Sequence, residues 1–168
     1  MPELRDPKEL KKYYKKGYGP TEKVVEKELK TDPDMILHGN RAINMQLPKY
    51  LQVYTEDYDI FSTNPKQDAK RIEKILDERY SGNFFEVRPS PKFADTFNVF
   101  SRVTKRKVAD LTKYDVDIPF KEIDSIKVAT LDHHLERIEA TLRDSSKKSR
   151  WDKDKETRQR ILLYKGKK

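Results

Sequence analysis

Two aspartates separated by a single residue are the first feature of this sequence that points to chemistry. Asp57 and Asp59 lie in residues 55–62, which read Thr-Glu-Asp-Tyr-Asp-Ile-Phe-Ser. Apolar and polar residues alternate there as in a strand with two different faces, so both carboxylates project from one face. Adjacent carboxylates repel each other unless a cation lies between them, and Mg²⁺ binds such oxygens together with substrate phosphates. The pair therefore predicts a site for a divalent metal, Mg²⁺ or Mn²⁺.

Asp110 is the candidate for a third carboxylate at this site. It stands between apolar residues in residues 107–111 (Lys-Val-Ala-Asp-Leu), on a predicted strand where a charge without a partner costs free energy. If the sheet brings Asp110 beside the first two aspartates, the three can hold two metal ions roughly 3.5–4 Å apart, as in phosphoryl transfer. A rival pair, Asp115 and Asp117, is predicted to lie in a surface segment, because no phosphate-binding loop precedes it.

The residues before the aspartate pair predict a phosphate-binding turn. Aspartate pairs of this spacing also occur on solvated strand faces without a metal, so the residues that precede the pair are what favour a metal site. Gly39, Asn40 and Arg41 lie where a loop should open a helix. A glycine lets the backbone approach a phosphate, and the free N–H groups at a helix N-terminus favour anions. Because Asn40 and Arg41 add side-chain donors for phosphate oxygens, the three residues are predicted to bind a triphosphate.

These motifs together resemble the DNA polymerase beta-like nucleotidyltransferase superfamily. The form Gly-x-Arg-Ala at residues 39–42, followed by Thr-x-Asp-Tyr-Asp-Ile at residues 55–60, is similar to two groups. These are the poly(A) polymerase catalytic subunits of large DNA viruses and the nucleotidyltransferase toxins of abortive-infection systems. The resemblance covers about residues 36–112. It implies a nucleotidyltransferase fold, a nucleoside triphosphate as donor, and metal binding by the three aspartates.

The sequence departs from the family pattern in two places and offers further candidates for substrate binding. Asn40 stands where the family most often has Ser or Gly, and the gap from Gly39 to the aspartate pair is long. Ser62, at the end of the aspartate segment, is taken as a substrate-binding candidate. Lys105 lies at a predicted basic hairpin tip, where it either grips a phosphate or is simply solvated. Lys153 lies in a segment that resembles the Arg-x-Lys-Asp segment near the end of several family members, so it is predicted to reach a phosphate.

Three further residues toward the C-terminus are weighed as candidates. Trp151 either stacks on a base or anchors the last helix to the core, and the second interpretation is favoured. His133 and His134 are neighbours on a helix, so they face different directions and are predicted not to share a metal.

The elements that must position these residues alternate between helices and short strands. Helices are predicted over 7–14, 21–32, 41–47, 66–80 and 131–142, with a last one ending near 163, and strands over 57–62, 84–87, 97–103 and 108–111. The last two strands form an antiparallel hairpin, and residues 115–128 are less regular. This order predicts an α+β fold with a small mixed β-sheet, flanking helices and helical N- and C-terminal extensions.

The predicted organisation is one compact domain with three parts. A helical N-terminal extension covers residues 1–34, a nucleotidyltransferase core covers 35–128, and C-terminal helices with a basic tail cover 129–168.

Composition limits the classes of function. The 168 residues contain 37 Lys and Arg against 29 Asp and Glu, a net charge of +8, which favours nucleic acid or another polyanion as a partner. No cysteine is present, so disulfides, thiolate zinc sites and cysteine nucleophiles are excluded. The charged opening and the lack of an apolar stretch of about 20 residues predict a soluble, cytoplasmic protein without a membrane span.

The sequence thus predicts a metal-dependent enzyme that moves a nucleotide from an NTP to an acceptor hydroxyl. RNA is the favoured acceptor, either a tRNA or a 3′ end, while DNA and protein hydroxyls stay open, as do the preferred NTP and the oligomeric state. The alternative is a non-catalytic protein on the same fold that binds nucleic acid or serves in assembly.

Overall fold

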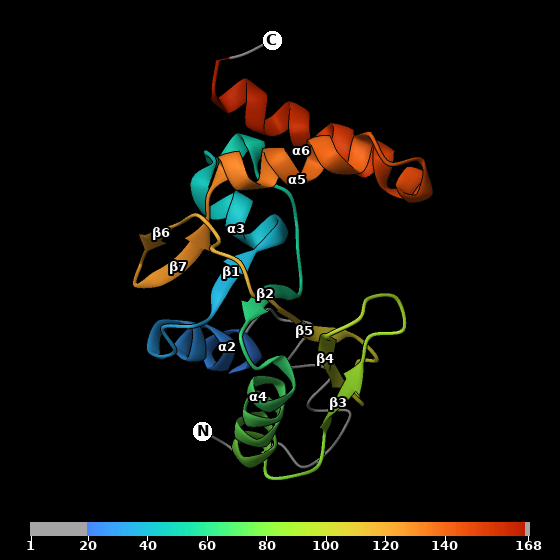
Figure 1. Cartoon of the computed structure of the whole chain (residues 1–168). Helices are drawn as coiled ribbons and strands as arrows, with labels where there is room; N and C mark the ends of the chain where they lie inside the picture. The colour runs from blue at the N-terminus through green and yellow to red at the C-terminus, as the bar shows by residue number, and fades with distance from the viewer. Residues whose placement is uncertain (1–19, 167–168) are drawn as a thin grey trace.

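In the computed structural model, residues 20–166 are described, and they form helices around one sheet (Figure 1). The helices are α2 (Pro20–Thr31), α3 (Gly39–Gln46), α4 (Pro65–Tyr80), α5 (Leu131–Leu142) and α6 (Trp151–Tyr164), with 3-10 helices η1 (Lys49–Leu51) and η2 (Ser145–Arg150). The strands are β1 (Ile36–His38), β2 (Tyr58–Ser62), β3 (Phe85–Pro89), β4 (Thr96–Ser101), β5 (Lys107–Lys113), β6 (Phe120–Ile123) and β7 (Ile126–Ala129). The helix predicted over residues 7–14 lies outside the described residues.

The strands form one seven-stranded sheet in the order β3-β4-β5-β2-β1-β7-β6. β2 pairs parallel to β5 and antiparallel to β1, while β1 pairs parallel to β7. β3, β4 and β5 are antiparallel, as the predicted hairpin required. The α+β class with a mixed sheet and flanking helices is confirmed. The centre of the sheet is β2, the strand that follows Asp57 and carries Asp59.

Strand β1 and the hairpin of β6 and β7 are the parts of the sheet that the sequence did not predict. Residues 115–128 were expected only to be less regular, and they contain both strands of the hairpin. β6 is an edge strand with almost every residue exposed, so it shows no alternation of apolar and polar residues. Its turn places Asp124 and Ser125 at positive φ, which is the conformation of a tight hairpin turn, but Asp-Ser lacks the glycine that marks one.

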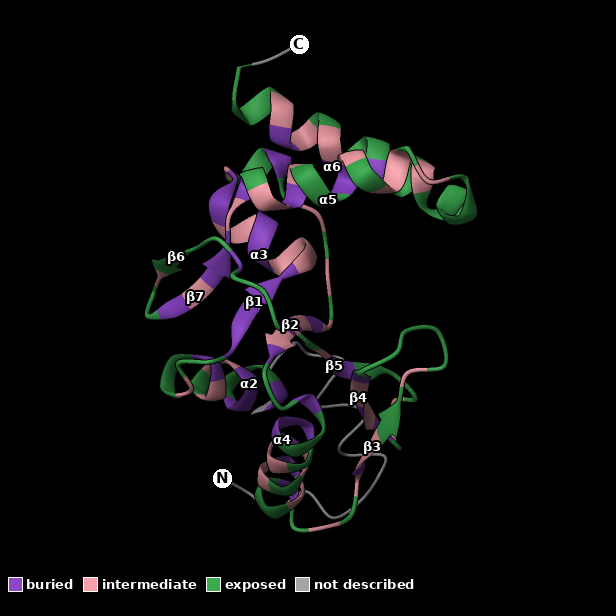
Figure 2. Cartoon of the chain, in the orientation of Figure 1, coloured by how far each residue is buried: buried purple, intermediate pink, exposed green. Residues whose placement is uncertain are grey.

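Two clusters of buried side chains hold these elements together. The larger one lies between the sheet and helices α2 and α4, and it includes Val25, Leu29, Tyr58 and Ile60. The smaller one joins α3 and η1 to α5 and α6. Figure 1 shows the same division, with α5 and α6 beside α3 and with α2 and α4 together at the other end. In Figure 2 the buried segments include most of β1 and β7. Helix α3 is therefore fixed between the sheet and the C-terminal helices.

Candidate active site

The three predicted carboxylates meet on the central strands. β2 and β5 are parallel neighbours, and their register places Asp59 directly opposite Asp110. Each of the residues Asp57, Asp59 and Asp110 offers a carboxylate oxygen, and these oxygens all lie within 4.8 Å of one another. Tyr58 and Ile60, between and after the aspartates, point the other way and are buried. The alternation expected from the sequence therefore places the carboxylates on one face and the apolar side chains in the core.

Burial and mutual repulsion make this cluster costly to ionise. Burial, followed by the charges of Asp57 and Asp110, raises the pKa of Asp59 to about 6. Burial also raises the pKa of Asp110, although the hydrogen bond from Lys107 opposes the change. The Oδ1 atom of Asp110 is buried and has no hydrogen-bond partner among the described residues. Three carboxylates with an unpaired buried oxygen are a ligand set that suits a hard divalent cation.

Lys107 supplies the nearest positive charge. Its Nζ lies 2.7 Å from Asp110 Oδ2 and 4.0 Å from Asp57 Oδ2. Lys107 opens β5 and Asp110 lies three residues later on the same strand. Lys107 lies two residues after Lys105 of the predicted basic hairpin tip, and the sequence did not predict this ion pair.

Gly39 is the point where the predicted phosphate turn touches the aspartates. It has φ +72°, and a Cβ added there would lie within 3.0 Å of the Cβ and Cγ atoms of Asp59. Only glycine fits this position, because the backbone conformation and the close approach both exclude a side chain. Its N–H donates to His134 Nε2 at 3.0 Å, and the ring's Nδ1 lies 2.8 Å from the carbonyl oxygen of Thr130.

His134 has a contact at the candidate site that the sequence did not predict. It is 4% exposed and lies on α5, far from Gly39 in the chain. Burial lowers its pKa to about 4, so the ring is neutral at pH 7 and Nε2 can accept the Gly39 hydrogen bond. Only the packing of α5 against α3 reveals this contact.

The side chains of Asn40 and Arg41 are held by other parts of the chain. Asn40 Oδ1 accepts a hydrogen bond from Arg160 Nη2 at 3.2 Å. Arg41 donates to the carbonyl oxygens of Asp57 and Glu56, at 3.1 and 2.7 Å. Its guanidinium also lies 3.9 Å from the ring centroid of Tyr58. Arg41 therefore holds the backbone that leads into β2.

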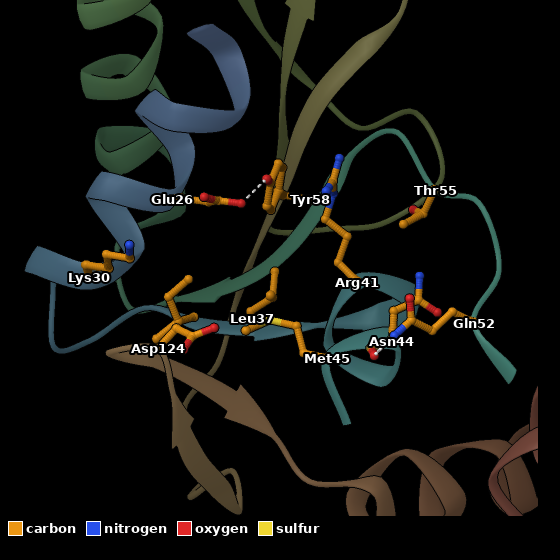
Figure 3. Close-up of a pocket in the computed structure, with 11 residues that line it drawn as sticks. Glu26, Lys30, Leu37, Arg41, Asn44, Met45, Gln52, Thr55, Tyr58 and Asp124 are labelled. Atoms are coloured by element: carbon orange, nitrogen blue, oxygen red, sulfur yellow. Dashed lines mark hydrogen bonds between the residues drawn. The ribbon is translucent and has the colours of Figure 1, made fainter. Parts of the chain in front are cut away.

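Arg41 also lines a pocket separate from the carboxylate cluster. The pocket has a volume of about 650 Å³, and Tyr58 is among its lining residues (Figure 3). In Figure 3, Arg41 lies beside Tyr58. The structure thus places Arg41 on the Tyr58 side of β2, while the prediction that it binds phosphate stays untested.

Of the other predicted substrate residues, Ser62 and Lys105 lie apart from the carboxylates. Ser62 is fully buried, and its Oγ donates to Asp68 Oδ2 at 2.5 Å. It follows Tyr58 and Ile60 in the strand alternation, so it faces the core and its position gives the prediction no support. Lys105 lies at the exposed hairpin tip with φ 59°.

The C-terminal helices direct positive charge toward the aspartates. Lys153, on α6, is close enough to Asp59 to lower its pKa against the larger effect of burial. Arg137, on α5, interacts electrostatically with Asp59, and its Nη1 lies 3.3 Å from His38 Nδ1. The sequence predicted Lys153 but missed Arg137, although its place one turn after His134 could have indicated that both face α3.

Trp151 takes the structural role that the sequence favoured. Its Nε1 donates to the carbonyl oxygen of Thr141 at 2.8 Å, which ties the start of α6 to the end of α5.

Within residues 20–166, every helix is too short or too polar to cross a membrane.

No protein-family model matches the sequence, and no curated protein matches it significantly. Among solved structures, the crystal structure of the Megavirus polyadenylate synthase is similar, with a TM-score of 0.70 at 18% identity. The likeness covers 86% of this chain and 31% of that chain, so this chain spans about a third of its neighbour's length. At this identity the likeness establishes the fold, and the chain has a nucleotidyltransferase-like fold.

Proposed function

We propose that this chain is a metal-dependent nucleotidyltransferase that moves a nucleotide from an NTP to a hydroxyl group of RNA. The observation that carries the proposal is the cluster of Asp57, Asp59 and Asp110 on adjacent parallel strands. Support comes from the fold shared with a polyadenylate synthase and from the net charge of +8, since a basic protein attracts polyanions.

In the proposed reaction, the acceptor oxygen forms a bond to the α-phosphorus and the bond to the bridging α,β-oxygen breaks. Pyrophosphate leaves, and the hydroxyl proton passes through the Asp110 carboxylate to solvent. Asp57 and Asp59 would hold the metal that binds the triphosphate, and Asp110 would complete the site for a second. Bound Mg²⁺ or Mn²⁺ would neutralise charge on the phosphates and acidify the acceptor hydroxyl. The chain's own residues contribute positioning and electrostatic stabilisation.

The triphosphate is assigned to the Asp59 side of the cluster. Gly39 touches Asp59 and opens α3. Its own N–H is bonded to His134, and the N–H groups that follow it in the first turn favour an anion. Lys153 and Arg137 bring two positive charges to the same side. Asn40, held by Arg160, would fix the orientation of the turn.

The alternative, a non-catalytic protein that binds nucleic acid, has one observation in its favour. Lys107 forms an ion pair with Asp110 and approaches Asp57, so an ammonium group could replace a metal as the permanent counter-charge of the cluster.

Replacing Lys107 with Met distinguishes the metal-dependent enzyme from the non-catalytic protein. If the cluster binds metal, removing the competing charge should strengthen Mg²⁺ binding in calorimetry; if the lysine is the counter-charge, the variant should only lose stability.

The deciding experiment follows transfer of label from each α-labelled NTP to total RNA with Mg²⁺ or Mn²⁺. The Asp57→Ala/Asp59→Ala double variant is the matched control. Label that the parent protein transfers and the variant does not would establish the enzyme, and the labelled species would identify the acceptor. Absence of transfer to RNA, DNA and protein would refute catalysis and favour the binding protein.

A further inference from the structure

An exposed tyrosine lies on the segment that leads into the aspartates. Tyr54 is 85% exposed and precedes Asp57 by three residues. Its hydroxyl donates to Glu56 Oε1 at 3.0 Å, and the same oxygen accepts a hydrogen bond from Arg106 Nη1 at 2.5 Å. These two bonds join the segment before β2 to the tip of the β4–β5 hairpin. Residues 54–56 and 105–107 therefore form one continuous surface, here called the Tyr54 rim.

The Tyr54 rim borders the side of the carboxylate cluster opposite the assigned triphosphate. Lys107, the last residue of the rim, contacts Asp110 and approaches Asp57. Gly39, by contrast, touches Asp59. With the triphosphate assigned to the Gly39 turn, the rim offers an acceptor hydroxyl a path to Asp110.

The rim combines an aromatic face with positive charge. A single exposed tyrosine is ordinary on a protein surface, but the hydroxyl of Tyr54 is anchored, so its exposed ring is held in place. The side chain of Arg106 is 66% exposed although it pairs with Glu56. The side chain of Lys105 makes no hydrogen bond or ion pair within residues 20–166. Aromatic rings that stack on bases and cations that follow the backbone are how proteins bind single strands.

We propose that the Tyr54 rim binds the single-stranded 3′ end of the RNA acceptor. Tyr54 stacks on a base, and Lys105 and Arg106 contact the phosphates. This inference rests on the proposed function for the position of the triphosphate, and it adds the form of the acceptor and the path by which it reaches Asp110.

The first test measures binding of a fluorescent single-stranded RNA of about 12 nucleotides by anisotropy, without NTP. Tyr54→Ala should weaken binding about tenfold, since loss of one stacked base costs that order of affinity. Tyr54→Trp should retain binding because the ring is kept. Tyr50→Ala is the matched control: Tyr50 is 82% exposed on the same connection, but no bond joins it to the hairpin tip, so its loss should leave binding unchanged.

The charge of the rim is tested through salt dependence. Lys105→Gln should weaken binding and lower the slope of log affinity against log salt by about 1, because one phosphate contact is lost. An unchanged slope would remove Lys105 from the interface.

In the transfer assay, Tyr54→Ala should raise the KM for RNA about tenfold and leave the KM for NTP unchanged. Equal behaviour of the Tyr54→Ala and Tyr50→Ala variants would overturn the inference, as would tighter binding to DNA of the same sequence or to duplex RNA. If the parent protein transfers no nucleotide but Tyr54→Ala still loses RNA binding selectively, the proposed function fails while the RNA-binding surface stands.

Discussion

At the scale of single residues, the candidate site depends on how closely Gly39 approaches Asp59. The carboxylate of Asp59 is already destabilised by burial and by two neighbouring aspartates. Because Gly39 has no Cβ atom, the first turn of α3 can lie against the Asp59 side chain. A side chain at position 39 would therefore displace either the turn or the Asp59 carboxylate.

Gly39→Ala should destabilise the protein by about 2 kcal/mol or more, because a Cβ at positive φ is strained and here also meets Asp59. Urea unfolding measures the change. Gly166→Ala is the control, since Gly166 has φ +70° but nothing lies within 4 Å of an added Cβ; it should cost about 1 kcal/mol at most. Equal losses in the two variants would contradict the steric argument.

Asp59→Asn should stabilise the metal-free protein by about 1–3 kcal/mol at pH 7 while abolishing nucleotide transfer. The pKa of Asp59 is raised from 3.8 to about 6 in the folded protein. The contribution of this carboxyl group to the free energy of unfolding is therefore fully favourable below pH 3.8 and is lost as the pH rises through 6. The advantage of the asparagine should therefore appear above pH 6 and vanish near pH 4.

The measurement is urea unfolding in EDTA at pH 4 and pH 7. Asp68→Asn is not a matched control, because Asp68 accepts a hydrogen bond from Ser62. Asp115→Asn is suitable, since Asp115 is exposed, and it should show no such pH-dependent gain.

At the scale of elements, α5 and α6 hold the turn at Gly39 and Asn40, although both helices lie outside residues 35–128, the predicted core. His134 accepts from the N–H of Gly39, and Arg160 donates to Asn40. Both contacts cross more than 90 residues of sequence. The turn therefore depends on C-terminal helices that a reading of residues 36–112 alone would leave out.

His134→Gln should make the protein less sensitive to acid. The pKa of His134 is lowered from 6.5 to about 4 in the folded protein. The contribution of this imidazole to the free energy of unfolding is therefore fully favourable above pH 6.5 and is lost as the pH falls through 4. The parent should lose about 3 kcal/mol relative to the variant over this range. Urea midpoints at pH 7, 5.5 and 4 measure the difference.

His133→Gln is the companion variant. His133 is only half-buried, and partial burial and the charge of Arg137 lower its pKa. A change in acid sensitivity as large as that of His134→Gln would show that the deep burial of His134 is not its cause.

At the scale of the whole molecule, the sheet gathers the three carboxylates, and helices and loops from distant parts of the chain surround them. Gly39 touches Asp59, and Lys153 and Arg137 interact with Asp59 electrostatically. Lys107 contacts Asp110, and the rest of the Tyr54 rim adjoins Lys107 in the chain or through Glu56. The proposed places of donor and acceptor are therefore formed by different elements.

Mg²⁺ with ATP should raise the melting temperature of the protein. A ligand at 100 times its Kd stabilises the fold by about 2.7 kcal/mol, which for a domain of this size is about 5–10 °C. Differential scanning fluorimetry with each NTP would also identify the preferred nucleotide. The Asp57→Ala/Asp59→Ala variant should show no shift, and a shift of equal size in that variant would place the nucleotide elsewhere.

The sequence alone determined the α+β class, the pair of aspartates on one strand face and the glycine turn before them. These are local properties: alternation fixes which way a side chain points from a strand, and glycine marks a backbone that must come close to another group. That Asp110 lies beside Asp59 was only a hypothesis, because the local pattern of residues does not determine the order of strands in a sheet.

Only the tertiary structure decided which distant residues complete the site. The pairing of β2 with β5 brings Lys107 to the cluster, and the packing of α5 on α3 brings His134 to Gly39 and Arg137 within electrostatic reach of Asp59. It also placed Ser62 in the core, away from the cluster. The physical reason is that pairing and packing free energies are sums over contacts between distant segments, and no window of sequence contains both partners.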